Sequence, residues 1–317
     1  RVVNQLSPVQ RDDVLLGLNA PDDAAVLEIP AGKVQVQSVD YFRSFIDDPY
    51  VFGQIAANHS LGDIFAMGAQ AQAAMAIATI PYGREQIVEQ QLFQVTAGAL
   101  QVLNHHHASL IGGHSSEGVE LSFGLSVTGT IEKEKLLAKG GMQVGDAIII
   151  TKPVGTGTLF AADMRGKAKG RWIAQAIDSM IHSSHTAAQC LYNYNVHACT
   201  DVTGFGVLGH LVEMVRAGQV DVSIDLNALP ILDGALETIQ LGIFSSLQPS
   251  NVRLRRAIKN QKVAATHQLY PLLFDPQTAG GLLAAVPKKF SDKCITKLHE
   301  LGYPYACVIG QVEKQAD

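Results

Sequence analysis

The sequence predicts an α/β (α+β) fold in two domains, and three observations lead to this prediction. The chain has 317 residues, which at roughly 150 residues per domain is enough for two domains. Hydrophobic residues make up 47% of it and charged residues only 17%, and these proportions exclude a disordered chain and a coiled coil. Strand-like and helix-like segments also alternate along the chain, as they do where helices pack on a sheet.

The first half begins with strand-like residues and continues into a helix. Apolar and polar residues alternate within residues 24–40, which predicts two short strands there. A helix is predicted over residues 48–68, because Asp48 before Pro49 gives an N-cap followed by a favoured first helical residue. The remaining elements of this half are a strand at 73–80, a helix at 85–103 and a strand pair around 112–113 and 121–130.

The second half follows a short polar segment with three glycines, residues 139–146, where we place the domain boundary. The prediction is an N-terminal domain of residues 1–142 and a C-terminal domain of residues 143–317. In the second domain we expect strands at 148–150, up to Cys199 and at 220–224, and a helix at 205–217 that Gly218 closes.

Charge and cysteine content exclude several classes of partner. The net charge is −5, and no run of Lys or Arg is long enough for a nucleic-acid or membrane patch, so we expect neither partner. The longest apolar stretch, residues 73–80, is too short to span a bilayer. The four cysteines, Cys190, Cys199, Cys294 and Cys307, form no C-x-x-C pair, which favours reduced thiols and the cytoplasm.

Glycines cluster where strand-like runs end. Glycine at such a place lets backbone N–H groups approach a ligand closely, as in phosphate-binding loops, although a single cluster is more often a tight turn. The chain has no G-x-x-x-x-G-K-[ST] loop, no H-E-x-x-H zinc motif and no kinase signature. The clusters lie at residues 112–115, 151–157, 201–209 and 275–281.

One of these clusters matches the dinucleotide fingerprint G-x-G-x-x-G through Gly204, Gly206 and Gly209, with Asp225 at the end of the next predicted strand. A dinucleotide-dependent oxidoreductase is therefore one alternative. Asp201 argues against it, because its carboxylate would face the pyrophosphate, and two anions repel each other unless a cation lies between them.

The same repulsion points to a metal. Mg²⁺ binds one or two carboxylates together with substrate phosphates, so acidic residues near a phosphate site are candidate ligands. Asp63 is the most informative of them, since Asp is unfavourable inside a helix and this helix otherwise contains small and apolar residues. The candidates are Asp22, Asp23, Asp40, Asp63 and Asp201.

Five ordered blocks of sequence run from near residue 20 to near residue 282. They are P-D-D-A-A-V at 21–26, S-L-G-D-I-F-A-M-G at 60–68, G-G-H-S at 112–115, D-V-T-G-F-G-V-L-G-H at 201–210 and D-P-Q-T-A-G-G at 275–281. Together they resemble selenophosphate synthetase (selenide, water dikinase), a family of the aminoimidazole ribonucleotide synthetase superfamily. The resemblance covers nearly the whole chain.

The resemblance implies two domains of the aminoimidazole ribonucleotide synthetase type. The N-terminal domain would bind ATP and metal and form a homodimer through its sheet, and the C-terminal domain would be α/β. The implied reaction converts ATP, selenide and water into selenophosphate, AMP and phosphate, with Mg²⁺ as the cofactor. By position, Asp23, Asp63 and Asp201 correspond to metal ligands. The implied ATP contacts are Asp22, Asp40, Asp63, Gly112, Gly113 and His114.

In one respect the sequence departs from the family. The family carries a Cys or selenocysteine and a Lys in a glycine-rich segment before the first strand, whereas the first Lys here is Lys33 and the first Cys is Cys190. We therefore assign no catalytic residue within this chain and expect that segment upstream of Arg1. The chain would then be a core that binds nucleotide. There are two other interpretations. The chain is a homologue that has lost the segment, or it is a non-catalytic nucleotide-binding module of a longer chain.

Overall fold

The computed structural model describes residues 2–18 and 24–315, and the chain divides into two compact units, Arg1–Leu136 and Leu137–Asp317. This division lies a few residues before the predicted boundary at 142. Asp22 and Asp23 are outside the described residues. Within the described ranges, no helix is both long and apolar enough to cross a membrane.

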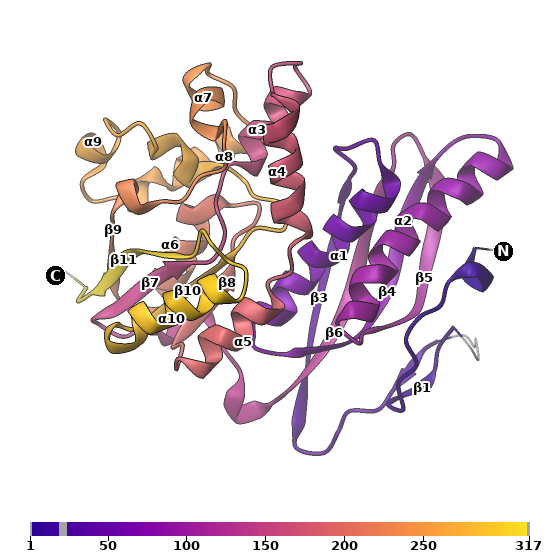
Figure 1. The fold of residues 1–317 in the computed structure, drawn as a ribbon. Coiled ribbons are helices and arrows are strands. Elements are labelled where there is room, and N and C mark those ends of the chain that lie inside the picture. The colour runs from indigo at the N-terminus through magenta and orange to yellow at the C-terminus, as the bar shows by residue number, and fades with distance from the viewer. Residues whose placement is uncertain (1, 19–23, 316–317) are drawn as a thin grey trace. The chain divides into compact units, whose positions relative to one another are not determined.

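Unit 1 is built on a four-stranded sheet in the order β3-β6-β4-β5. Neighbouring strands are antiparallel except β4 and β5, which are parallel and connected through helix α2. Helices α1 and α2 cover one face of this sheet (Figure 1). The bounds are β3 (Lys33–Arg43), α1 (Pro49–Ala66), β4 (Gln70–Pro81), α2 (Glu85–His105), β5 (Ser109–Gly118) and β6 (Ser122–Glu132).

Shorter elements precede and follow this sheet. A 3₁₀ turn, η1 (Val3–Gln5), comes before a two-stranded antiparallel sheet of β1 (Val14–Leu16) and β2 (Val26–Leu27). A second 3₁₀ turn, η2 (Lys133–Lys135), follows β6.

Two glycines allow α1 and α2 to pack closely. A Cβ atom at Gly53 would lie 2.0 Å from the carbonyl oxygen of Val95, and one at Gly98 would lie 1.9 Å from that of Tyr50. Any larger residue at either position would therefore push the helices apart. The core of the unit lies between the helices and the sheet and includes Phe52, Ile55, Leu61, Phe65, Phe123 and Leu125.

Unit 2 is built on a five-stranded sheet in the order β8-β10-β7-β11-β9, in which every neighbouring pair is antiparallel. Its strands are β7 (Asp146–Ile150), β8 (Ala198–Asp201), β9 (Asp221–Ile224), β10 (Leu282–Pro287) and β11 (Cys307–Glu313). The strands at the centre are apolar and buried along their length, since helices cover the sheet.

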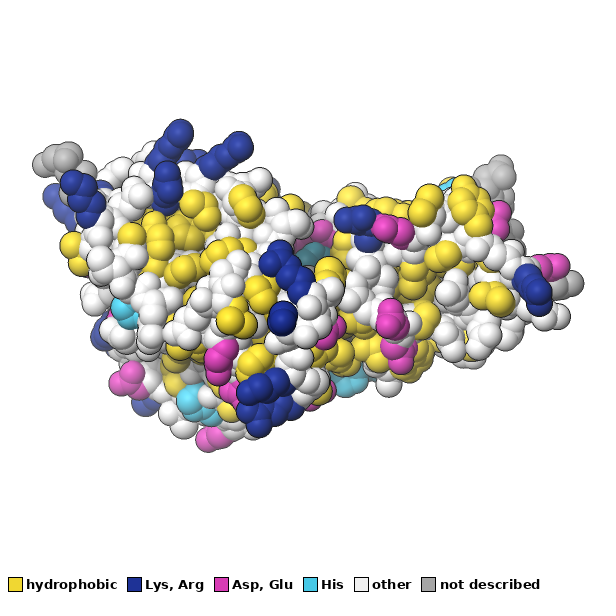
Figure 2. All heavy atoms as spheres, turned by 90° about the horizontal axis from the view of Figure 1, so that it is seen from above, with side chains coloured by type: hydrophobic (Ala, Val, Ile, Leu, Met, Phe, Trp, Pro, Cys, Tyr) yellow, Lys and Arg dark blue, Asp and Glu magenta, His cyan; other side chains and the backbone are white. Residues whose placement is uncertain are grey.

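The helices of unit 2 connect these strands. They are α3 (Thr156–Asp163), α4 (Gly170–Ile181), α5 (His185–Asn193), α6 (Gly206–Gly218), α7 (Ala235–Gln240), α8 (Gln248–Asn251), α9 (Gln261–Ala264) and α10 (Lys288–Glu300). The 3₁₀ segments are η3 (Lys139–Gly141), η4 (Leu226–Ala228), η5 (Val252–Ala257) and η6 (Tyr270–Phe274). Figure 2 shows Lys and Arg side chains in several places on the face that it presents.

The predicted α/β (α+β) class and most of the predicted elements are confirmed. Helix α1 begins after Asp48, whose Oδ1 accepts hydrogen bonds from Tyr50 N and Val51 N at 2.9 and 3.0 Å. The prediction for the end of α6 was wrong. Gly218 is still helical, and the left-handed residue that terminates the helix is Gln219, with φ 54°.

Candidate functional site

Two of the predicted site residues, Asp40 and Asp63, lie together in unit 1. Asp40 is on β3 and points toward α1, as Ser38 and Phe42 do, because alternate residues of a strand share one face. Asp63 lies near the end of α1, on the side of the helix that meets β3. The two carboxylates are close enough for the charge of Asp63 to raise the pKa of Asp40.

Two further side chains contact this pair. Ser38 Oγ donates a hydrogen bond of 2.5 Å to Asp63 Oδ2. His59, one helical turn before Asp63, places its Nε2 3.8 Å from Asp40 Oδ1, and its ring packs edge-on against Phe42. The sequence analysis missed Ser38 and His59. The signal was in their spacing, two residues from Asp40 in a strand and four from Asp63 in a helix.

The surroundings of Asp40 fit a bound cation. Burial, and next the negative charge of Asp63, raise the pKa of Asp40 to about 6. A cation beside both carboxylates would remove the repulsion, and oxygen donors are those that Mg²⁺ prefers. The described residues contain no group of three or more His, Cys, Asp or Glu side chains that could bind a metal by themselves. A metal at Asp63 would therefore need further donors.

The predicted glycine segment, residues 112–114, lies on β5 at the edge of the same sheet. Gly113 has φ 156°, and a Cβ atom there would lie 2.3 Å from the carbonyl oxygen of Ala76 on β4, so this position requires glycine. His114, the next residue, is exposed. The backbone and the imidazole of this segment are thus available to a ligand at the β5 edge.

The sheet register relates this segment to Asp40. Asp40 pairs with Leu125, Leu125 with Ala76, and Ala76 with Gly113, so the four residues form one row across the sheet. Asp40 and Gly113 stand at opposite ends of the row, about 14 Å apart for three strand spacings. The structure therefore aligns these two predicted groups without bringing them into contact.

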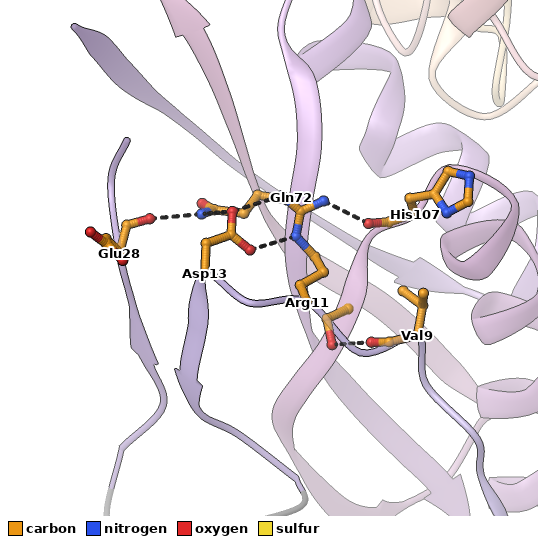
Figure 3. Close-up of polar contacts among 7 residues, drawn as sticks. Val9, Arg11, Asp13, Glu28, Gln72 and His107 are labelled. Atoms are coloured by element: carbon orange, nitrogen blue, oxygen red, sulfur yellow. Dashed lines mark hydrogen bonds and ion pairs between the residues drawn. The ribbon is translucent and has the colours of Figure 1, made fainter. Parts of the chain in front are cut away.

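The chain on either side of residues 22–23 is fixed to the same sheet (Figure 3). Arg11 makes a bidentate ion pair with Asp13, with both N···O distances 2.7 Å, and lowers its pKa. Gln72 on β4 donates from Nε2 to Asp13 Oδ2 and to the Glu28 carbonyl oxygen, both at 2.9 Å. Since Asp13 precedes β1 and Glu28 follows β2, the network anchors both ends of the segment that carries residues 22–23.

In unit 2, Asp201 is the last residue of β8 and is buried. It lies opposite Leu282 of β10 in the sheet register. The backbone just after it is held by His210 of α6, whose Nε2 accepts a hydrogen bond from Thr203 N at 3.0 Å. Asp201 thus has a defined position, but in a different unit from Asp40 and Asp63.

The glycine cluster before α3 is not a phosphate-binding loop, because its amides already have partners. Gln277 Oε1 accepts hydrogen bonds from Gly155 N and Thr156 N at 3.0 and 3.1 Å. Asp275 Oδ2 accepts one from Gly157 N at 3.1 Å. These amides are the start of α3, which has no side-chain cap of its own. The D-P-Q-T-A-G-G block therefore caps a helix of the same unit.

A buried lysine supports the same block from the other side. Lys152 Nζ donates to the carbonyl oxygens of Ser179, His182 and Ala279, the first and last at 3.0 and 3.1 Å. Burial lowers the pKa of Lys152 to about 7. The sequence analysis assigned Lys152 and Gln277 no function. They lie within two of the glycine clusters, and only the tertiary structure shows that these two clusters pair.

The topology of unit 2 contradicts the dinucleotide-binding interpretation. That fold needs a helix between neighbouring parallel strands, whereas β8 and β9, which flank α6, lie at opposite edges of an antiparallel sheet. Asp225 begins η4 and accepts a hydrogen bond from Asn227 N at 2.9 Å. Gly206, with φ 69°, passes the backbone of Phe274 and Asp275 at close range. Gly206 therefore serves chain direction and Gly209 allows close packing with Phe205 and Leu254, whereas a Cβ atom at Gly204 would meet nothing within 4 Å.

Comparison with protein families covers both units. The family described as AIR synthase related protein, N-terminal domain, matches residues 21–131, and its counterpart for the C-terminal domain matches residues 143–317. Among curated proteins, the selenide, water dikinase of Pelobacter propionicus is 38% identical over 303 residues, which are 96% of this chain and 86% of that protein. The selenide, water dikinase of Clostridioides difficile is 35% identical over 303 residues, 95% and 86% of the two chains.

Solved structures share the fold at lower identity. The thiamine-monophosphate kinase of Stenotrophomonas maltophilia has a TM-score of 0.73 at 21% identity, covering 96% of this chain and 90% of its own. The hydrogenase maturation protein HypE in complex with ATP has a TM-score of 0.71 at 17% identity, covering 92% and 80%. At these identities the likeness concerns the fold alone.

Proposed function

Because the chain belongs to the selenide, water dikinase family, we propose that it is a phosphotransferase that converts ATP, selenide and water into selenophosphate, AMP and phosphate. The observation in the structure that carries this proposal is the carboxylate pair of Asp40 and Asp63, which is half-buried and mutually repelling. Such a pair is costly in a folded protein unless a cation binds to it, and ATP is used by enzymes as its complex with Mg²⁺.

The proposed metal ligands are Asp23, Asp63 and Asp201. Bound Mg²⁺ would neutralise the phosphate oxygens and stabilise charge on the transferred group. The protein's own contribution is positioning: Ser38 holds the Asp63 carboxylate in one orientation, and β8 with His210 holds the chain at Asp201. Selenide is a strong nucleophile and needs little activation by the protein.

The proposed nucleotide contacts are on the sheet of unit 1. Asp40 and Gly113 share a row of the register, and Gly112 and the exposed His114 flank Gly113 on β5. Asp22 belongs to the same proposal, with Asp63 contacting the nucleotide through the metal. Among the four cysteines, Cys190, Cys199 and Cys294 are buried and Cys307 is half-buried, so we propose no nucleophilic cysteine within this chain.

We also propose that the protein is a homodimer that associates through the sheet of unit 1. The face opposite α1 and α2 exposes a row of large apolar side chains. Val39, Tyr41 and Met75 have 58%, 45% and 42% of their surface accessible. Exposed large apolar side chains on one face of a sheet are typical of an interface between subunits. Light scattering coupled to gel filtration should give twice the mass of the chain. Val39→Lys should reduce the measured mass to that of a single chain.

The cellular setting follows from the same chain. All four cysteines are free thiols, as expected in a reducing compartment, and we propose the cytoplasm. With a net charge of −5 and an acidic unit 1, we propose that neither nucleic acid nor a membrane is a partner.

The reaction is tested by ³¹P NMR on this chain and on a fusion of this chain to the Cys- and Lys-containing N-terminal segment of a selenide, water dikinase relative, each with ATP, Mg²⁺ and selenide under anaerobic conditions. We expect signals of AMP, phosphate and a new selenophosphate species that depend on selenide. If ATP stays intact in both proteins while an ATP analogue still binds, the protein is a non-catalytic nucleotide-binding module and not a synthetase. If neither ATP nor its analogue binds, the site itself is wrong.

A further inference from the structure

The two units differ in charge. Residues 1–136 contain seven Lys and Arg against fifteen Asp and Glu, whereas residues 137–317 contain seventeen against fourteen. Within unit 2 the imbalance is concentrated in one stretch. Residues 238–274 contain five Lys and Arg and no acidic residue. This stretch is locally positive in a chain of net charge −5, which favours an anionic partner over a basic one.

These basic side chains are exposed on η5 and the residues that follow it. Lys259 is paired with Asp221 at 2.5 Å. Arg253, Arg255 and Arg256 are exposed, and no described acidic residue pairs with them. In a 3₁₀ helix, residues three apart lie directly above one another, so Arg253 and Arg256 point the same way, about 6 Å apart along the axis.

Large apolar side chains border the arginines. Phe205 is 54% exposed and Leu247 is 55% exposed. Phe205 and Leu254 both pack against Gly209, which places the exposed phenyl ring beside η5. We name the set Arg253, Arg255, Arg256, Leu247 and Phe205 the arginine surface.

We propose that the arginine surface is a docking site for an acidic, amphipathic helix of another protein. Guanidinium groups bind carboxylates in a bidentate manner. Carboxylates four residues apart on an α-helix are about 6 Å apart along the axis, which matches the spacing of Arg253 and Arg256. The exposed Phe205 and Leu247 favour a protein over a nucleic acid, because an aromatic anchor beside arginine is typical of protein interfaces, whereas backbone recognition of nucleic acid is polar.

The surface is connected to the chain that follows Asp201. Asn251 Nδ2, at the end of α8, donates hydrogen bonds to the carbonyl oxygens of Gly204 and Phe274 at 2.8 and 3.0 Å. Residue 204 lies three positions after Asp201. A partner docked on η5 would therefore lie beside Asn251, which holds the loop after Asp201. The docking site itself depends on surface charge and exposure, and it stands whether or not the proposed reaction is correct.

The test uses the whole chain and fluorescence anisotropy. The probes are a fluorescein-labelled alanine-based helical peptide with Glu pairs four residues apart and Leu beside them, the same peptide with Gln in place of Glu, and a short RNA duplex. The variants are Arg253→Ala/Arg256→Ala, Phe205→Ser, and the control Lys288→Ala/Lys293→Ala, which removes two exposed charges from α10 of the same unit.

We expect the Glu peptide to bind, and its Kd to rise about tenfold in Arg253→Ala/Arg256→Ala and several-fold in Phe205→Ser. The control should stay within about twofold of the unchanged protein. Four results would each overturn the proposal. The Glu peptide could fail to bind, or the Gln peptide could bind equally well. The control variant could weaken binding as much as Arg253→Ala/Arg256→Ala, or the RNA could bind and not be displaced by the peptide. Circular dichroism of each variant establishes that the fold is intact.

Discussion

Ser38 on β3 donates a hydrogen bond of 2.5 Å to the Oδ2 atom of Asp63 on α1, and this bond joins the edge of the sheet to the helix that covers it. Both side chains belong to elements that also carry Asp40 and His59. The orientation of the Asp63 carboxylate is thus set by a neutral hydroxyl, which leaves its charge uncompensated by any described cation at hydrogen-bonding distance. This arrangement supports the proposed role of Asp63 as a metal ligand.

Substitution of Asp63 tests the metal site. Asp63→Asn keeps the shape and the contact with Ser38 but removes the charge, so Mg²⁺-dependent binding of an ATP analogue should be lost in a calorimetric titration. The control is Asp47→Asn, an exposed carboxylate just before the same helix, which should bind like the unchanged protein. Unchanged binding in Asp63→Asn would remove this residue from the site.

Substitution of Ser38 tests positioning. Ser38→Ala removes one hydrogen bond to a charged group, so we expect the Mg²⁺-dependent affinity for the analogue to fall by about three- to tenfold. The free energy of unfolding should also fall, by about 1.5–3 kcal/mol, because this bond joins β3 to α1. A loss as complete as that of Asp63→Asn would instead mean that Ser38 itself contacts the ligand.

Substitution of Gly53 tests the packing of α1 on α2. A Cβ atom at Gly53 would lie 2.0 Å from the Val95 carbonyl oxygen, so Gly53→Ala should lower the free energy of unfolding by about 3 kcal/mol or more. At Gly83 the nearest atom to such a Cβ is 3.7 Å away, and Gly83→Ala should change stability by less than about 1 kcal/mol. Urea denaturation of the two variants should separate them clearly.

The raised pKa of Asp275 should make the stability of the protein depend on pH. Burial raises its pKa to about 7, above the value of 3.8 expected for an unfolded chain. The native state therefore binds more protons between pH 4 and 7, and stability falls as the pH rises through this range. Asp275→Asn cannot titrate. We expect its free energy of unfolding, relative to the unchanged protein, to increase by on the order of 2–4 kcal/mol from pH 4 to pH 7.5. A pH-independent difference would show that Asp275 is ionised throughout.

Substitution of Lys152 tests how much its hydrogen bonds contribute to the stability of the protein. Lys152→Met would keep most of the side-chain volume and leave three carbonyl oxygens, of which that of Ala279 is buried, without this donor, which should cost about 3 kcal/mol. Lys167→Met, at an exposed lysine of the same unit, is the control and should cost less than about 1 kcal/mol. Similar stability of both variants in urea would mean that water replaces the ammonium group.

The elements were largely predictable because their signals are local. The cap at Asp48, the apolar strand around residues 73–80 and the helix closed near Gly218 each depend on neighbouring residues. Gln219 in the left-handed region was not predictable, since that conformation usually selects Gly or Asn. The sheet order was not predictable either, because β8 and β9 are near in sequence and lie at opposite edges of the sheet.

The candidate site was predictable residue by residue, whereas its partners were not. Asp63 stood out as a charged residue inside an otherwise small and apolar helix, and Asp40 as an acid near the end of a predicted strand. Ser38 and His59 share a face with Asp40 and Asp63 by their spacing, but spacing alone did not select them, since Ser is common in strands and a single His in a helix is usually structural. Their role appears only when α1 lies against β3.

The most direct test of the account is a calorimetric titration of this chain with a non-hydrolysable ATP analogue, with and without Mg²⁺. We expect saturable binding only when Mg²⁺ is present, because Asp40 and Asp63 repel phosphate unless a cation lies between them. Equally tight binding without Mg²⁺ would contradict the carboxylate–metal–phosphate site, and so would the absence of binding under both conditions.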